Sequence, residues 1–297
     1  MSAGPVYFNG DPRRHTTFRL TAPEGVDLLG RKWQATRPRA VLCYLHGMGD
    51  HSGTFAALGE RLSEAGITCY AHDHRGFGGS GGPRGDVGSL DTLVGDASLV
   101  LHRARDENPT LPTFIAGLSM GGALALRLAA REPRVAGVIA LAPGLKLRHP
   151  PSPGMLARVL WSLLVSPARR IASPFPVTWT TNNPEALAAI QADPQWLRVF
   201  TARFYWATLQ SSRRLWPELQ KVRVPSLFVV AGEDRVVDNR AVRAGFGLVP
   251  CPDKTYRQIN GAWHNLVVDP LREEVAAAVR DWIWVRLERL TPSEREA

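Results

Sequence analysis

The serine at position 119 lies in a pattern typical of nucleophilic catalysis. Residues 117–121 read Gly-Leu-Ser-Met-Gly and fit the G-x-S-x-G nucleophile elbow, a sharp strand-to-helix turn that exposes the serine hydroxyl. An apolar stretch at 114–116 precedes the motif, and a helical pattern at 123–130 follows it. The turn requires glycine at both ends of the motif, because a side chain there would collide with a neighbouring strand or helix. We therefore expect Ser119 to be a nucleophile.

A serine hydroxyl needs a histidine that accepts its proton and an acid that orients this histidine. His264 is the only histidine after His149 and lies between the last predicted strand and the last predicted helix. Asp234 follows the end of the preceding predicted strand, and Glu233 and Asp238 are its competitors. The order Ser, acid, His is the order expected after an elbow of this type. We expect His264 to be the general base and Asp234 to be the acid.

The oxyanion of an acyl-transfer intermediate needs backbone N–H donors. Met120 follows the nucleophile and offers its N–H at the start of a helix. The second donor should come from the loop after the predicted strand 41–45, where the glycine-flanked Met48 is the best candidate. We interpret the neighbouring His46 as a residue that braces this loop.

The sequence argues against two other chemistries, a metal site and a dinucleotide site. Four histidines occur at 46, 51, 72 and 74, but no His and carboxylate cluster has metal-ligand spacing, so no metal is expected. Residues 76–81 spell G-x-G-x-x-G after a strand, with Asp96 twenty residues beyond the first glycine, as in a dinucleotide site. Gly82-Pro83 follows where a helix should begin, so this segment is predicted to be a loop and no cofactor is expected.

These residues need a scaffold, and the alternation of short apolar runs with amphipathic stretches predicts one. Strands are expected at 17–21, 26–34, 41–45, 67–71, 114–116, 135–141, 226–230 and 255–259. Helices are expected at 55–65, 90–105, 123–130, 240–247 and 271–290. Strands and helices in this rhythm indicate an α/β fold, a mostly parallel sheet with helices on both faces.

The segment 143–217, called the insertion below, interrupts this rhythm. It is too long for a loop and has helical patterns of its own, so it is predicted to be a helical cap between core parts 1–142 and 218–297. Apolar residues at 155–164 repeat at helical spacing, and Leu160, Trp161 and Leu164 are our candidate contacts for an apolar substrate. A face that only packs on the body of the insertion is the alternative left open. The insertion holds five of the nine tryptophans, Trp161, Trp179, Trp196, Trp206 and Trp216.

Composition excludes several classes of protein. No apolar run reaches the roughly 18 residues of a membrane span, and residues 1–14 lack the apolar core of a signal sequence. The chain has three cysteines, which lie far apart in the sequence, and this argues against a disulfide scaffold. A protein without disulfides suits a reducing compartment, so we expect it in the cytoplasm. The net charge of +9 is spread along the chain, which argues against nucleic-acid binding. The positive charge would also suit peripheral contact with an anionic membrane surface, and this alternative stays open. The sequence does not predict the oligomeric state.

The motifs in order resemble the α/β-hydrolases of the monoacylglycerol lipase and lysophospholipase-like group, of the serine aminopeptidase S33 type. The resemblance covers about residues 15–287 and implies the same catalytic residues, Ser119, Asp234 and His264, with Met48 and Met120 as the oxyanion hole. Leu118 stands where many relatives have histidine, a position not needed for proton transfer. The motifs that carry the resemblance are His46-Gly47-Met48-Gly49-Asp50-His51-Ser52-Gly53, His72-Asp73-His74-Arg75-Gly76-Phe77-Gly78-Gly79-Ser80, Gly117-Leu118-Ser119-Met120-Gly121-Gly122, Gly232-Glu233-Asp234 and Gly261-Ala262-Trp263-His264.

The sequence thus predicts a serine ester hydrolase for small-molecule or lipid esters with an apolar acyl chain, most simply monoacylglycerols or lysophospholipids. Two alternatives stay open. One is other acyl-transfer chemistry on the same residues, by a peptidase or an acyltransferase. The other is a binding protein of hydrolase fold without catalysis, a class that typically lacks one of the three catalytic residues.

Overall fold

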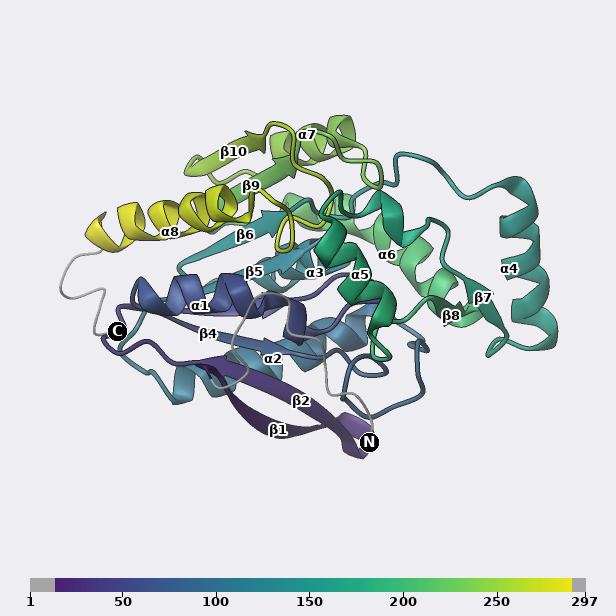
Figure 1. Ribbon diagram of the computed structural model, residues 1–297, viewed down its shortest axis with the longest axis horizontal. Coiled ribbons are helices and arrows are strands. Elements are labelled where there is room, and N and C mark those ends of the chain that lie inside the picture. The colour runs from purple at the N-terminus through teal and green to yellow at the C-terminus, as the bar shows by residue number, and fades with distance from the viewer. Residues whose placement is uncertain (1–13, 290–297) are drawn as a thin grey trace.

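An eight-stranded sheet runs through the centre of the molecule (Figure 1), seen here in a computed structural model that describes residues 14–289. Positions 1–13, on which the expectation of no signal sequence rests, and position 290, the predicted last residue of the final helix, lie outside the described residues. The strands are β1 (Thr16–Ala22), β2 (Val26–Trp33), β3 (Ala40–Leu45), β4 (Ile67–His72), β5 (Thr113–Leu118), β6 (Gly137–Leu141), β9 (Ser226–Ala231) and β10 (Lys254–Ile259).

The strand order is β1-β2-β4-β3-β5-β6-β9-β10. β1 pairs antiparallel with β2, and β2 pairs antiparallel with β4. Every pair from β4 to β10 is parallel. The carboxyl ends of the parallel strands therefore lie along one edge of the sheet, where loops of distant sequence can meet.

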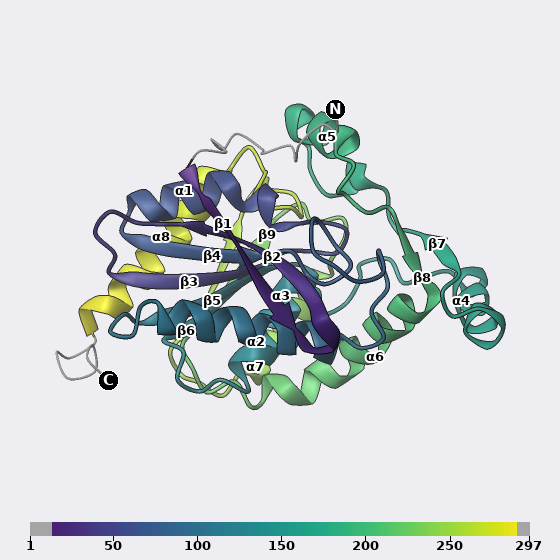
Figure 2. The ribbon, with the colours of Figure 1, turned by 90° about the horizontal axis from the view of Figure 1, so that it is seen from below.

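Helices cover both faces of the sheet (Figure 2). Side chains alternate between the faces of a strand, and β3 shows the result: Leu42 belongs to the core cluster beneath α1 and α8, and Val41 to the cluster beneath α2, α3 and α7. This arrangement confirms the predicted α/β architecture. The helices are α1 (Ala56–Glu64), α2 (Leu90–Asp106), α3 (Met120–Ala129), α7 (Asn239–Leu248) and α8 (Arg272–Arg289), with short 3-10 turns η2 (Pro23–Gly25) and η3 (Ser52–Phe55).

The insertion lies beyond the carboxyl edge of the parallel strands, on the right of Figure 1. It holds α4 (Pro153–Val165), β7 (Arg170–Ala172), η4 (Val177–Trp179), α5 (Pro184–Ala192) and β8 (Val199–Thr201), and α6 (Ala202–Leu219) begins in it. β7 and β8 form a separate antiparallel pair, which the sequence does not predict. Each of these strands has three residues, so only pairing with the distant partner makes it a strand.

No helix within residues 14–289 combines the length and the apolar character that a bilayer span requires.

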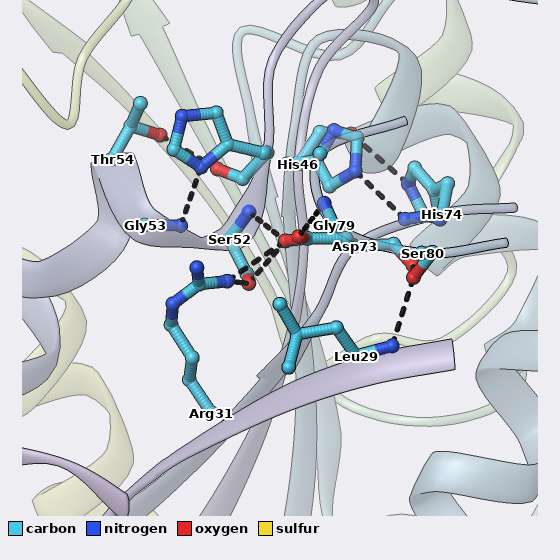
Figure 3. Close-up of polar contacts among 12 residues, drawn as sticks. Leu29, Arg31, His46, Ser52, Gly53, Thr54, Asp73, His74, Gly79 and Ser80 are labelled. Carbon is cyan, nitrogen blue, oxygen red and sulfur yellow. Dashed lines mark hydrogen bonds and ion pairs between the residues drawn. The ribbon is translucent and has the colours of Figure 1, made fainter. Parts of the chain in front are cut away.

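A buried carboxylate, Asp73, ties together the loops beneath the carboxyl edge (Figure 3). It accepts hydrogen bonds from the backbone N–H groups of Ser52 and Gly79, at 2.8 Å each, and faces the Arg31 guanidinium at 3.0 Å. The glycine-rich segment 76–81 wraps around this carboxylate, and no helix begins directly after it, since α2 starts only at Leu90. Burial alone would raise the pKa of Asp73, but Arg31 and the other donors outweigh it and lower the pKa to about 2.

The lowered pKa predicts an acid-dependent contribution to stability. A carboxyl whose pKa is lower in the folded state stabilises that state above its unfolded pKa, and the contribution disappears as pH falls from about 4 to about 2. Asp73→Asn should therefore destabilise the protein most above pH 4, by roughly 2 kcal/mol more than at pH 2. Denaturant unfolding of both proteins across this range measures the difference. A difference that does not change with pH would contradict the assignment.

Candidate active site

Ser119 sits at a strained turn between β5 and α3. Its φ of +56° lies in a region that residues other than glycine seldom adopt. The turn is possible because Gly117 and Gly121 have no side chains and let the backbone segments approach closely. A Cβ at Gly121 would lie 2.1 Å from Leu45 O, and a Cβ at Gly117 would lie 2.2 Å from Gly121 O. The close approach fits the elbow expected from the sequence, and it presents the serine hydroxyl above the end of the sheet.

His264 stands between Ser119 and Asp234 and is hydrogen-bonded to both. Its Nε2 lies 2.9 Å from Ser119 Oγ, and its Nδ1 lies 2.8 Å from Asp234 Oδ2. Because a carboxylate only accepts hydrogen bonds, Nδ1 carries the ring proton and Nε2 is left to accept the serine O–H. The three residues follow β5, β9 and β10, whose carboxyl ends lie along one edge of the sheet. The fold thus brings together the three residues that the sequence singles out.

The Asp234 side chain is held as a buried carboxylate. Burial by itself would raise its pKa. The neighbouring His264 and the N–H groups of Val236 and Val237, each 2.8 Å from Oδ1, outweigh burial and hold the pKa below its usual value. Asp234 is therefore ionised at neutral pH, as an acid that orients an imidazole must be.

The two competing acids lie elsewhere. Asp238 caps α7 by accepting the N–H of Arg240, and it lies 3.9 Å from the Lys146 ammonium. Glu233 has an exposed side chain, and its backbone N–H donates to Ala262 O. Neither side chain has a hydrogen bond to His264 among the described contacts.

Two backbone N–H groups near Ser119 lack an acceptor in the described part of the protein. Within residues 14–289, neither the Met48 N–H nor the Met120 N–H donates to another protein group. Met48 and Met120 both line the pocket that contains Ser119. Met120 is the first residue of α3, where the helix dipole adds positive potential. These N–H groups could receive an oxyanion.

The loop that carries Met48 is braced from beneath by two histidines, seen at the upper right of Figure 3. His46 Nδ1 lies 2.8 Å from Gly47 O, and His46 Nε2 accepts the backbone N–H of His74 at 2.9 Å. Burial lowers the pKa of both rings well below the usual value, so both are neutral. No group of three or more His, Cys, Asp or Glu suited to a metal ion occurs in the described part of the chain.

A largely apolar pocket of about 280 Å³ opens above Ser119. Its walls come from the core and from the insertion, chiefly from α4 and α6. The sequence analysis does not predict the α6 contribution, although Tyr205, Leu209 and Ser212 have the helical spacing that could reveal it. Apolar residues that line it include Leu90, Ala123, Met155, Val159, Leu209, Leu215 and Val237.

The side of α4 that faces the pocket differs from the one predicted. Met155, Leu156 and Val159 line the pocket, whereas Leu160, Trp161 and Leu164 do not. Those last three are 43%, 60% and 82% exposed. Helical spacing identifies which residues share a face, but α4 is apolar on more than one side, so spacing alone could not select the inner one.

Comparison with known proteins places this site in context. Residues 36–271, well over half of the chain, match the model of the serine aminopeptidase S33 family. The human monoglyceride lipase is 31% identical over 254 residues, which cover 83% of this chain and 82% of the relative. The phospholipase YtpA of Bacillus subtilis is 28% identical over 251 residues, which cover 84% of this chain and 96% of the relative.

A solved structure agrees with these relatives. The monoacylglycerol lipase of Paleococcus ferrophilus superposes with a TM-score of 0.77 at 25% identity, covering 91% of this chain and 99% of the other. The family match, the relatives and the shared architecture lead to one conclusion: this chain belongs to the serine aminopeptidase S33 family and has the α/β-hydrolase fold.

Proposed function

We propose that this protein is a serine hydrolase that cleaves carboxylic esters of lipids. The observation that carries the proposal is the position of Ser119, which lines an apolar pocket and is hydrogen-bonded to His264, while His264 is in turn hydrogen-bonded to Asp234. Relatives named as monoglyceride lipase and phospholipase support lipid esters as the substrate class. Of this class we favour monoacylglycerols and lysophospholipids, which carry a single acyl chain.

The reaction begins with attack of Ser119 Oγ on the ester carbonyl. His264 Nε2 takes the hydroxyl proton, and the Asp234 carboxylate stabilises the imidazolium that forms. The carbonyl oxygen becomes an oxyanion, which the N–H groups of Met48 and Met120 receive. Preorganised donors of this kind are typically worth about 3 kcal/mol each in the transition state.

Two steps then complete the cycle. When the intermediate collapses, the alcohol oxygen takes the proton from His264, and the acyl group stays on Ser119 as an ester. A water molecule next gives its proton to His264 and attacks this acyl-enzyme. The carboxylic acid leaves, and the proton returns to Ser119.

The pocket favours an acyl chain over a peptide. An aminopeptidase needs an anionic group to receive the N-terminal ammonium of its substrate. Lys146, a cation, is the only charged residue that lines the pocket within the described part of the chain. Burial of an acyl chain against the apolar walls instead stabilises the complex by about 0.8 kcal/mol for each methylene. We therefore place ester hydrolysis ahead of peptidase activity.

Substitutions of Ser119 and His264 test the proposal. Ser119→Ala and His264→Ala should each lower ester hydrolysis at least ~1,000-fold, and the double variant should be no worse than Ser119→Ala, because these residues act as one unit. The measurement is kcat/KM on monoacylglycerols, lysophospholipids and aminoacyl amides, together with labelling of Ser119 by a fluorophosphonate.

Wild-type protein that neither takes up this label nor cleaves any of these substrates would be a binding protein, and the proposal would be wrong. A preference for aminoacyl amides over esters would instead identify the protein as a peptidase.

Two matched substitutions by asparagine test the assignment of Asp234 as the acid. Asp234→Asn should reduce kcat about 10⁴-fold, because an amide that donates to His264 favours the wrong tautomer. Asp238→Asn should leave kcat unchanged and cost at most about 1 kcal/mol of stability through the cap of α7. Steady-state kinetics and thermal unfolding of the two variants separate these effects. If Asp238→Asn were the more damaging to kcat, the acid would be misassigned.

We also propose that the outer side of α4 contacts an anionic membrane surface. Leu160, Trp161 and Leu164 are exposed there, and the exposed Arg158 and Arg169 lie on the same helix and just after it. Apolar side chains beside arginines are the usual composition of an interfacial helix. The cytoplasm stays our predicted location, in keeping with Cys43, Cys69 and Cys251, which are free and buried.

Vesicle binding tests the α4 surface. Leu160→Ser combined with Leu164→Ser should weaken cosedimentation with phosphatidylglycerol vesicles at least about tenfold, since two apolar side chains no longer leave water. Val285→Ser is the control, because Val285 is an exposed apolar residue on α8, outside the insertion. Equal vesicle binding by the double variant and the wild type would exclude this surface.

A further inference from the structure

The insertion holds the loop that carries Met48 through a buried histidine. His51 Nε2 lies 2.7 Å from Asp193 Oδ2, although the two residues are 142 positions apart. The side chains are 0% and 3% exposed. Asp193 directly follows α5, so this contact joins the insertion to the loop between β3 and η3.

The hydrogen bonds of His51 define which atom donates. The backbone N–H of Gly53 donates to His51 Nδ1 at 3.0 Å, so Nδ1 is the unprotonated nitrogen of the ring. Nε2 therefore carries the proton and donates it to the Asp193 carboxylate. The other oxygen of Asp193 accepts the N–H of Gln195, which fixes the carboxylate in place.

A second contact of the same segment reaches the residue after Met48. The N–H of Leu197 donates to Gly49 O at 2.8 Å. Gly49 has a φ of +84°, and a Cβ there would lie 2.6 Å from Leu197 O, so the insertion and the loop are in close contact. Residues 193–197 thus hold the loop at Gly49 and at His51, while His46 and Ser52 anchor it to the core.

We propose that Asp193 is a positioning residue that acts through His51 to keep the Met48 N–H directed at the oxyanion. This inference rests on the proposed function, in which Met48 is an oxyanion donor. It assigns to the insertion a part in transition-state stabilisation, in addition to its part in the pocket wall. Loss of the contact should therefore lower kcat and leave KM almost unchanged, because the ester carbonyl of the bound substrate carries little charge.

A structural tether would behave differently, and the molecule offers a matched control. Arg203 at the start of α6 pairs with Asp86 of the core, with Nε 2.9 Å from Asp86 Oδ1. This ion pair also joins the insertion to the core, but within residues 14–289 neither side chain is hydrogen-bonded to residues 46–51, and neither residue lines the pocket. Arg203→Met therefore loosens the same junction without touching the loop.

The experiment compares four variants of the full chain. Asp193→Asn keeps the shape of the side chain but replaces one acceptor with a donor that opposes His51 Nε2–H. His51→Leu removes the donor, and His51→Gln restores an N–H at a similar position. The readouts are kcat and KM on a monoacylglycerol, the inhibition constant of an alkyl trifluoromethyl ketone, which forms an oxyanion on the serine, and the melting temperature.

Asp193→Asn and His51→Leu should lower kcat at least about tenfold, part of the 100- to 1,000-fold that a whole oxyanion donor provides, and should weaken the ketone by a similar factor. KM should stay within about threefold, because ground-state binding is unchanged. His51→Gln should recover most of the loss. Arg203→Met should lower the melting temperature while kcat stays within about twofold.

Two results would overturn the inference. Asp193→Asn with a lower melting temperature and an unchanged kcat would make the contact a structural tether only. Losses of kcat that follow the melting temperature in all four variants, Arg203→Met included, would lead to the same conclusion. Wild-type protein without ester hydrolysis or fluorophosphonate labelling would instead overturn the proposed function, and this inference with it.

Discussion

The close approach of three backbone segments around Ser119 is the constraint on which the site depends. β3, β5 and the first turn of α3 meet without room for a side chain at Gly117 or Gly121, and the φ of +56° at Ser119 follows from that contact. A strained residue persists only where its surroundings over-determine it. The central strands of the sheet supply this rigidity, because β3 and β5 are paired on both sides. The Ser119 hydroxyl is therefore positioned by fully buried strands.

Buried charges set the loops around this rigid centre. Asp73 is held ionised by Arg31 and by backbone donors, and Asp234 by His264 and two N–H groups. Each carboxylate gathers donors from segments distant in the sequence and so holds these segments together. The insertion joins this network through Asp193, which is fixed by its own donors. The insertion and the loops around Ser119 are thus connected by directed hydrogen bonds as well as by apolar packing.

The sequence predicted the features that depend on local pattern. The G-x-S-x-G segment needs only its own glycines and flanking elements to identify Ser119, and the predicted strand ends placed Asp234 and His264 at one edge of a parallel sheet. What it could not supply depends on three-dimensional packing. α4 is apolar around much of its surface, so Leu160 and Leu164 could not be told from Met155 and Val159 without its neighbour α6. The β7 and β8 pair and the Asp193 contact join residues that no periodicity connects.

The order of the strands also governs when activity can first arise during synthesis of the chain. β3, β4, β5 and β6 leave the ribosome early and can pair as a parallel sheet with Ser119 at its turn. The insertion emerges next, before Asp234 and His264 exist. One face of the sheet, covered by α1 from the start, stays only partly covered until Trp282 and Ile283 of α8 arrive. A nascent chain of this length therefore holds the proposed nucleophile and most of the pocket but lacks the proposed acid and base, which the last two strands of the sheet bring to the site.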